Sequence, residues 1–301
     1  MIKIKKHRSL KRARRISNAL TYTILIIISI IWLIPFVYLV LQSFRKEPGA
    51  YTTYIIPKEF TFDNYIRLFK NEVPFQFMTW YLNTFIVALV TAIIQTILVL
   101  MVSYAFSRLR FKFRKKYMKL ILILGMFPGF MSMIAIYQML KLVGLSESIF
   151  SLIIVYCGSA AMQYYISKGF FDTIPYSLDE AAKIDGANER TIFFKVIMPL
   201  AKPIVIYTLL MAFTAPWGDY MFASYLANGD ANKFNVAVGL YTFLTTTNRY
   251  EWFTSFCAGA VLVSIPITIL FFVLQKYYVE GVTGGAVKGW LIKNYYYHYQ
   301  Y

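Results

Sequence analysis

The sequence has 301 residues, of which 58% are hydrophobic and only 15% are charged. Because an average soluble domain is about 25% charged, this composition and a mean hydropathy of +0.54 place the chain among membrane proteins. The formal net charge of +17 raises the question of a nucleic-acid partner. The Lys and Arg residues lie in short segments between apolar runs, which is typical of membrane-protein loops, so no nucleic acid is expected.

The side chains of most enzyme and metal sites are missing from the body of the chain. Its two histidines, His7 and His298, lie near the ends, and Cys157 and Cys257 lie inside apolar runs, where no disulfide is expected. The sequence contains no phosphate-binding P-loop, no H-E-x-x-H and no C-x-x-C. We therefore expect no catalytic residue, no metal site and no cofactor bound by this chain.

Apolar runs long enough to cross a bilayer recur along the chain, and they predict an all-α integral membrane bundle of about six transmembrane helices. The runs cover residues 19–42, 81–106, 118–139, 150–170, 203–224 and 254–277. The first is too long for the apolar part of a signal peptide, so we interpret it as a span. The predicted organisation is a basic N-terminus at 1–18, a six-span domain at 19–289 and a tail at 290–301.

The loops differ in charge, which predicts their orientation. Segments 1–18 and 107–116 are rich in Lys and Arg, whereas 140–149 contains only Lys141 and 225–253 only Lys233 and Arg249. Since cytoplasmic loops carry the excess of Lys and Arg, the first two segments are expected on the cytoplasmic side. Six spans then place both termini and the loop 171–202 in the cytoplasm.

The loop 171–202 is mixed in charge and is predicted to fold as two short helices. Ser177 and Glu180 have the spacing of a capping box, with Ser177 as N-cap. Gly186 is expected to end this first helix with a positive φ. A second helix is expected from Asn188 to Pro199, and its predicted apolar stripe consists of Ile192, Phe193, Val196, Ile197 and Leu200. The first helix is expected to present a small-residue face made of Leu178, Ala181, Ala182 and Asp185.

The spacing of this loop resembles the EAA loop of ABC importer permeases. In that family, Glu-Ala-Ala is followed by three residues, a glycine, nine residues and then Ile-x-Leu-Pro. The matching positions here are Glu180, Ala181, Ala182, Asp185, Gly186, Ala187 and Pro199. Val196 and Met198 depart from the family's apolar identities, but the spacing is intact. The resemblance to the sugar-importing, maltose-type branch extends over 83–85, 104–108, 235–240 and 278–289.

The resemblance implies a permease subunit of a bacterial cell membrane importer, not an enzyme. Its implied partners are a second permease, two ATPase subunits that bind ATP and Mg, and an extracytoplasmic sugar-binding protein. The implied substrate is maltodextrin or a related oligosaccharide. The EAA loop would dock on the ATPase, where Glu180 would pair with an Arg; the alternative is that Glu180 only caps its helix.

Other functions remain open at this point, including a permease for another solute and a secondary carrier. A carrier usually needs charged residues inside its spans for ion coupling, and Asp219 is the one clear case here. Polar and aromatic side chains inside spans suit the hydroxyl edges and apolar faces of sugars. The candidates for a substrate path are Asn83, Gln138, Gln163, Tyr164, Trp217, Asp219 and Tyr220. Alternatively, these side chains hold neighbouring helices together.

Overall fold

The computed structural model describes residues 4–50, 52–70, 75–127, 129–146, 148–247 and 249–297, and within these ranges it leaves the side chains of 4–11, 130 and 277–297 undescribed. Regular structure in the described ranges is helical, apart from one isolated bridge between Arg45 and Phe60. The all-α prediction is therefore confirmed. The motif at 278–289 lies in a described helix, but its side chains lie outside the description.

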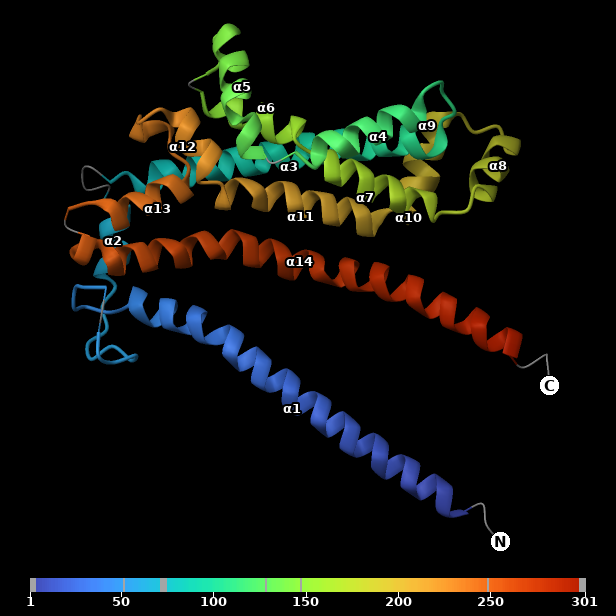
Figure 1. The fold of residues 1–301 in the computed structure, drawn as a ribbon, viewed down its shortest axis with the longest axis horizontal. Helices are drawn as coiled ribbons and strands as arrows, with labels where there is room; N and C mark the ends of the chain where they lie inside the picture. Colours follow the sequence, from blue (N-terminus) through green and yellow to red (C-terminus); the bar gives the residue numbers. More distant parts are fainter. Residues whose placement is uncertain are drawn as a thin grey trace. The chain divides into compact units, whose positions relative to one another are not determined.

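The helices follow one another along the chain as drawn in Figure 1. The first half contains α1 (Ile4–Ser43), α2 (Asp63–Phe69), α3 (Phe77–Arg108), α4 (Arg114–Gly125), α5 (Gly129–Leu142) and α6 (Ile149–Gly158). The second half contains α7 (Ala161–Asp172), α8 (Ser177–Ile184), α9 (Glu189–Thr191), η1 (Ile192–Ile197), α10 (Met198–Leu200), α11 (Lys202–Gly218), α12 (Met221–Ala227), η2 (Ala231–Lys233), α13 (Val236–Thr245) and α14 (Arg249–Tyr297).

Among the described residues, three helices are long and apolar enough to cross a membrane, or up to five if each bent pair counts as one span. The single helices are α1, α3 and α14. One bent pair is α6 with α7, at an angle of 43°, and the other joins 189–200 to α11 at 82°. This agrees with a membrane bundle, but three of the predicted spans, 118–139, 150–170 and 203–224, are not continuous helices.

The prediction of one helix over 118–139 is wrong, because the chain leaves helical structure between α4 and α5. Figure 1 shows α5 pointing away from the direction of α4. The residue before a proline is disfavoured in the helical region, and Phe127 precedes Pro128. The prediction of one helix over 203–224 is also wrong, because α11 ends at Gly218 and α12 starts at Met221.

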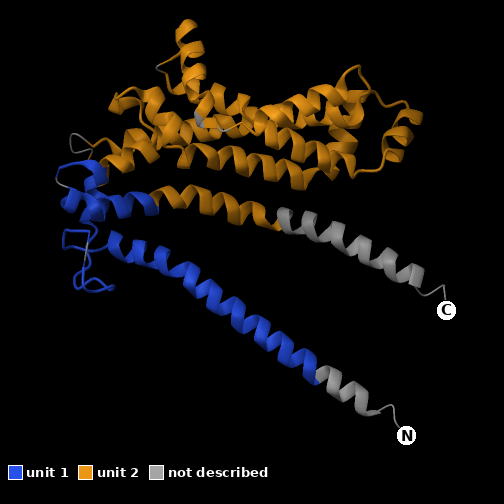
Figure 2. Ribbon diagram, viewed as in Figure 1, with its two compact units in different colours: residues 1–67, 243–261 blue, residues 68–242, 262–301 orange. Residues whose placement is uncertain are grey.

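The chain divides into two compact units, coloured in Figure 2. Unit 1 comprises residues 1–67 and 243–261, and unit 2 comprises 68–242 and 262–301. In unit 1, the apolar side chains of α1 between residues 12 and 37 are exposed. An apolar helix of this length with no buried face needs lipid or another protein around it.

Unit 1 is held together by buried polar contacts near the end of α1. The Asn64 amide donates to the carbonyl oxygens of Ser43 at 3.0 Å and Arg45 at 2.8 Å. The Thr254 hydroxyl donates to Asn64 Oδ1 at 2.8 Å. Because Asn64 lies on α2 and Thr254 on α14, one side chain joins the loop after α1 to two helices.

Unit 2 is built around α3, which packs against α6, α7 and α11. Two buried apolar clusters lie along it. The cluster near the C-terminal end of α3 consists of Leu100, Tyr104, Phe171, Ile174, Ile192, Ile197, Ala201 and Ile204. The other consists of Val87, Leu140, Leu152, Ile153, Ala223, Leu226 and Val238. Residues 171–202 contribute several side chains to the first cluster. The break at Asp219 lies four residues before Ala223, which belongs to the second cluster.

Candidate functional site

The first helix of the predicted coupling loop forms, but without the capping box. α8 spans Ser177–Ile184, its N-cap is Tyr176, and no side chain caps it. Tyr176 is already in the helical region, and its carbonyl accepts from the Glu180 amide at 3.1 Å. Ser177 therefore sits inside the first turn, where its hydroxyl does not serve as the cap. The Glu180 side chain is exposed and has no capping role, contrary to the prediction.

Gly186 ends α8 as predicted, with φ +79°. Its amide donates to the Lys183 carbonyl at 3.0 Å, and the Ala187 amide donates to the Ala182 carbonyl at 2.9 Å. These two bonds define a Schellman motif, in which the residue after the helix takes the left-handed conformation that glycine adopts without strain. A Cβ added at Gly186 would meet no atom within 4 Å, so the backbone angle alone requires glycine.

The second helix begins at Asn188, as predicted. Its side-chain oxygen accepts from the Thr191 amide at 2.9 Å, which makes Asn188 a true N-cap. The helix then runs through a π-helical stretch, η1, where the Met198 amide bonds to the Phe193 carbonyl. Since π-helical turns are rare and recur at functional sites, this stretch is a distinctive feature of the loop.

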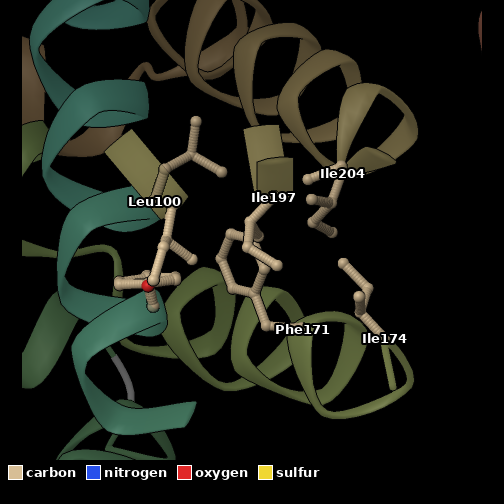
Figure 3. Packing of buried hydrophobic residues seen from close by; sticks show 8 residues of the cluster. Leu100, Phe171, Ile174, Ile197 and Ile204 are labelled. Carbon is tan, nitrogen blue, oxygen red and sulfur yellow. The ribbon is translucent and has the colours of Figure 1, made fainter. Parts of the chain in front are cut away.

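The predicted apolar stripe is confirmed except at its end. Ile192 and Ile197, five residues apart, are fully buried, which fits the wider π-helical turn better than an α-helical one. Phe193 and Val196 are half-buried against the same cluster, but Leu200 is 50% exposed. Figure 3 shows Ile197, Phe171 and Leu100 converging from three elements.

A buried ion pair that the sequence analysis did not identify fixes α8 to the end of α3. Arg108 Nη1 lies 3.3 Å from Asp179 Oδ2, and the two side chains are only 3% and 10% exposed. Arg108 Nη2 also donates to the carbonyls of Phe171 at 3.1 Å and Ile174 at 2.7 Å. The guanidinium lies 4.3 Å from the centre of the Tyr176 ring. One arginine thus holds the start of the loop through charge, hydrogen bonds and an aromatic ring.

Two further contacts reinforce this junction. The Tyr176 hydroxyl donates to the Ser107 carbonyl at 2.6 Å, and the Ser107 hydroxyl donates to Asp172 Oδ1 at 2.7 Å. Arg108 lies in the segment 104–108, where the sequence resembles the maltose-type branch, and Asp179 lies beside Glu180. An arginine at the last position of an apolar helix and an acidic residue in the loop 171–202 were the available signal for this pair.

Most of the remaining loop residues are exposed, and those of α8 and the following turn make up the exposed face. Glu180, Ala181, Asp185, Gly186 and Pro199 are exposed. Ala182 and Ala187 are instead half-buried against the apolar cluster, and because Ala182 belongs to the predicted small-residue face, that face is divided between solvent and core. At the edge of this face, Lys183 Nζ lies 2.7 Å from Glu189 Oε1, and this hydrogen bond raises the pKa of Lys183. The exposed face therefore presents the carboxylates of Glu180 and Asp185 and the small side chain of Ala181. Ala182 and Ala187 attach this segment to the apolar cluster.

Asp219 lies at the break between α11 and α12, not inside a span as predicted. Its Oδ1 accepts from the Phe222 amide at 3.0 Å, so it caps the first turn of α12. Its Oδ2 accepts from the Tyr156 hydroxyl on α6 at 2.6 Å. The Asn235 amide donates to the Asp219 carbonyl at 2.6 Å and to the Pro216 carbonyl at 3.1 Å. Tyr156 and Asn235 were not among the candidates, and their contacts favour a structural role for Asp219.

Of three other candidates, Trp217 and Tyr220 lie beside this break, and Asn83 lies near the N-terminal end of α3. Trp217 is 4% exposed, and its indole N–H has no hydrogen-bond partner among the described residues. Tyr220 is 40% exposed and lies 4.7 Å from Tyr241, measured between ring centres. Asn83 donates to the carbonyls of Asn232 at 2.8 Å and Phe234 at 3.1 Å, which ties the loop before α13 to α3.

The other three candidates are separate from this group. Gln138 is exposed on α5, and Gln163 and Tyr164 are half-buried on α7. The Gln163 side-chain oxygen is buried and has no hydrogen-bond partner in the described part of the chain. The Tyr164 carbonyl accepts from the Ser103 hydroxyl at 3.0 Å. The structure therefore brings Trp217, Asp219 and Tyr220 together but does not join them to Gln138, Gln163 or Tyr164.

Two substitutions of Asp219 distinguish a need for its negative charge from a need for its hydrogen bonds. Asp219→Asn keeps an oxygen for the Phe222 amide or the Tyr156 hydroxyl, so we expect near-normal amounts in the membrane. Asp219→Ala removes both acceptors and should destabilise the junction by about 1–3 kcal/mol. The measurement is the amount of folded protein by fluorescence-detected size exclusion, together with solute uptake. Altered solute selectivity in Asp219→Asn at a normal protein level would instead indicate a direct role in the substrate path.

Comparisons with known proteins agree with one family. A family model described as "Binding-protein-dependent transport system inner membrane component" matches residues 98–284. The chain is 37% identical over 281 residues to the galactooligosaccharides transport system permease protein GanQ of Bacillus subtilis (strain 168), covering 93% of this chain and 99% of that protein. It is 38% identical over 282 residues to the maltodextrin transport system permease protein MalD of Streptococcus pneumoniae (strain ATCC BAA-255 / R6), with coverage of 93% and 99%.

A solved structure has the same fold over most of the chain. It is the crystal structure of a bacterial ABC transporter involved in the import of the acidic polysaccharide alginate. One of its chains matches with a TM-score of 0.72 and 26% identity, covering 89% of this chain and 98% of that chain. A chain of the MetNI methionine ABC transporter also matches, with a TM-score of 0.54 and 15% identity, which supports the fold alone.

Proposed function

We propose, from the premise that this chain belongs to the family of inner membrane components of binding-protein-dependent transport systems, that it is the permease subunit of an oligosaccharide importer. The family match covers more than half of the chain and includes the whole loop 171–202. The membrane is the cytoplasmic membrane of a bacterium. The substrate is maltodextrin or a related oligosaccharide, in keeping with relatives named for the transport of maltodextrin and galactooligosaccharides.

The proposed assembly contains a second permease, two ATPase subunits and an extracytoplasmic sugar-binding protein. ATP and Mg are bound by the ATPase subunits, and this chain forms part of the translocation path. The observation that carries the coupling part of the proposal is the buried pair of Arg108 and Asp179 beneath an exposed α8. A movement of the ATPase that displaces α8 is transmitted to α3 only if the two helices move together. The buried Arg108, with its ion pair and two hydrogen bonds, provides a rigid connection between them.

The exposed face of the loop suits an ATPase cleft. Glu180 and Asp185 offer carboxylates to a basic partner, and Ala181 allows close approach of another backbone. Because Glu180 makes no capping bond, its carboxylate is available for an arginine of the ATPase. Gly186 and Ala187 form the turn after α8, and Ala187 packs against the apolar cluster, whereas Pro199 is exposed near the end of the second helix.

For the substrate, the exposed ring of Tyr220 beside Asp219 is the strongest of the candidates. Its neighbour Tyr241 lies 4.7 Å away between ring centres, and paired rings suit the apolar face of a sugar. We assign Asn83 and Trp217 to the support of this region, because the first binds loop carbonyls and the second is buried. Gln163, with an unpaired buried oxygen, is the candidate on α7.

Transport specificity is tested by reconstituting the chain with its partner subunits and the binding protein. We expect ATP-dependent uptake of radiolabelled maltotriose or a galactooligosaccharide, and no uptake without ATPase subunits. Phosphate and an amino acid serve as control solutes. Uptake that persists without ATPases would contradict the importer and favour a secondary carrier. If only a control solute were taken up in an ATP-dependent way, the proposal that the solute is an oligosaccharide would be wrong.

The proposed orientation has both termini and α8 in the cytoplasm. A version without Cys157 and Cys257 would carry one new cysteine, either Ile184→Cys or Asn232→Cys, at positions that are exposed. A membrane-impermeant maleimide added to intact spheroplasts should label position 232 and leave position 184 unlabelled until the membrane is opened. Labelling at 184 but not at 232 in intact cells would reverse the topology.

A further inference from the structure

Two adjoining grooves at the start of α4 gather the positive charge of segment 107–116. The first has a volume of about 640 Å³ and is lined by Arg110, Arg114, Lys115 and Lys116, together with Phe113 and Tyr176. The second, of about 320 Å³, shares Arg114 and Lys115. It adds Lys119 and the apolar side chains of Met118 and Leu122. All of these residues belong to unit 2.

The charges that line these grooves are largely uncompensated. Among the described residues, Arg110, Lys115, Lys116 and Lys119 form no ion pair with a carboxylate. Arg114 donates to the carbonyls of Ser107 and Leu109, both at 3.2 Å, and so keeps its full charge. Lys168, at the edge of the second groove, is paired with Asp172. The grooves therefore attract an anion.

The backbone at the entrance is held in a costly conformation. Phe113 has φ +71°, a left-handed backbone conformation that is rare and strained for a bulky residue. Its ring lies 5.2 Å from Lys112 Nζ and 5.2 Å from Lys116 Nζ. The turn thus places an aromatic ring between two ammonium groups at the rim of the first groove, where a ring and cations together suit an amphipathic ligand.

The direction of α4 favours a lipid over a free anion. Its first residues are basic, and beyond them Leu120, Ile123 and Leu124 are 50%, 50% and 61% exposed, which gives α4 an apolar surface suited to acyl chains. The second groove is lined by both Lys119 and the apolar Leu122. A ligand that fills both grooves needs negative charge at one end and a hydrocarbon chain at the other.

We propose that these grooves bind the headgroup of an anionic phospholipid of the adjacent leaflet, with its acyl chains along α4. Basic pockets at the ends of membrane helices are suited to such headgroups. Tyr176 lines the first groove and also donates to the Ser107 carbonyl at the anchor of α8. An occupied groove would stabilise this anchor. The binding itself does not depend on the transport function proposed above.

Native mass spectrometry of the purified full chain in its complex tests the site, with phosphatidylglycerol and phosphatidylcholine as probes. The first phosphatidylglycerol should bind about tenfold tighter than phosphatidylcholine. Lys115→Gln, which removes a charge shared by both grooves, should weaken that binding by about fivefold and leave phosphatidylcholine binding unchanged. The matched control is Arg14→Gln, which removes one exposed charge from α1.

The outcomes separate a built site from simpler explanations. Equal weakening by Lys115→Gln and Arg14→Gln would mean diffuse attraction to the membrane and overturn the proposal. Glycerol 3-phosphate binding as tightly as phosphatidylglycerol would make the ligand a free anion. Unchanged lipid binding with loss of an ATPase subunit would make the grooves a protein-docking surface. If Lys115→Gln does not insert, equal affinity of the wild-type protein for the two lipids would by itself refute the site.

Discussion

Arg108→Met is expected to release α8 from α3 and to abolish the coupling of ATP hydrolysis to uptake. The substitution removes the cation that faces Asp179, which is only 10% exposed at its side chain. It also removes the guanidinium hydrogen bonds to the carbonyls of Phe171 and Ile174, of which the first still accepts from the Ile174 amide. Removing one partner of a buried ion pair typically costs about 3–5 kcal/mol. The cost should appear as local opening of 174–190, because α3 is packed along its length by other helices.

Hydrogen exchange of this segment measures the effect without relying on transport. Protection of the α8 amides should fall by about a hundredfold or more. The double variant Arg108→Met with Asp179→Leu removes both charges and should recover part of the protection. Glu189→Gln is the control, since it breaks the exposed pair with Lys183 in the same loop and should leave exchange near that of the wild type. Unchanged protection in Arg108→Met would show that the pair is not the anchor.

Gly186→Val is expected to reduce uptake and binding-protein-stimulated ATPase activity severely while the chain still inserts into the membrane. The left-handed conformation at φ +79° costs a β-branched residue about 1–3 kcal/mol. Relief of this strain would break the amide bonds of Gly186 and Ala187 to the end of α8. The exposed face would then no longer be held in one geometry.

Gly186→Asn is the matched control, because asparagine tolerates the left-handed region and the Cβ that both variants add would meet no atom within 4 Å. It should transport at close to the wild-type rate, with equal protein in the membrane by immunoblot. Wild-type uptake by Gly186→Val would contradict the role of this turn in coupling. Loss of uptake in both variants would mean that the ATPase needs the bare glycine surface and not the backbone angle.

The sequence by itself determined the class of fold and the position of the turn between the two short helices of residues 171–202. Long apolar runs define membrane helices because no other spanning structure of a single apolar segment satisfies its backbone in lipid. The glycine at 186 and the asparagine at 188 are local signals, since the conformation that each favours depends on its own side chain and its nearest neighbours. These features were therefore predicted correctly.

Helix breaks were harder to predict because apolar composition continues through them. Hydropathy does not distinguish one helix over 203–224 from two helices joined at Asp219. The distinction depends on a carboxylate that caps α12 and accepts from Tyr156, which is 63 residues away. The capping box failed for a related reason. Ser177 and Glu180 have the right spacing, but Tyr176 is held by Ser107 and Arg108 and starts the helix one residue early.

Only the tertiary structure decided which side chains anchor α8 to α3. Arg108 and Asp179 are 71 residues apart, and nothing in the local sequence pairs them until α3, α7 and α8 meet. Burial then changes the consequence of the charge, since an ion pair in an interior of low dielectric is costly to break, whereas the same pair in water contributes little. Spacing along the chain identifies a loop, but the cost of leaving a charge unpaired depends on what surrounds it in the folded protein.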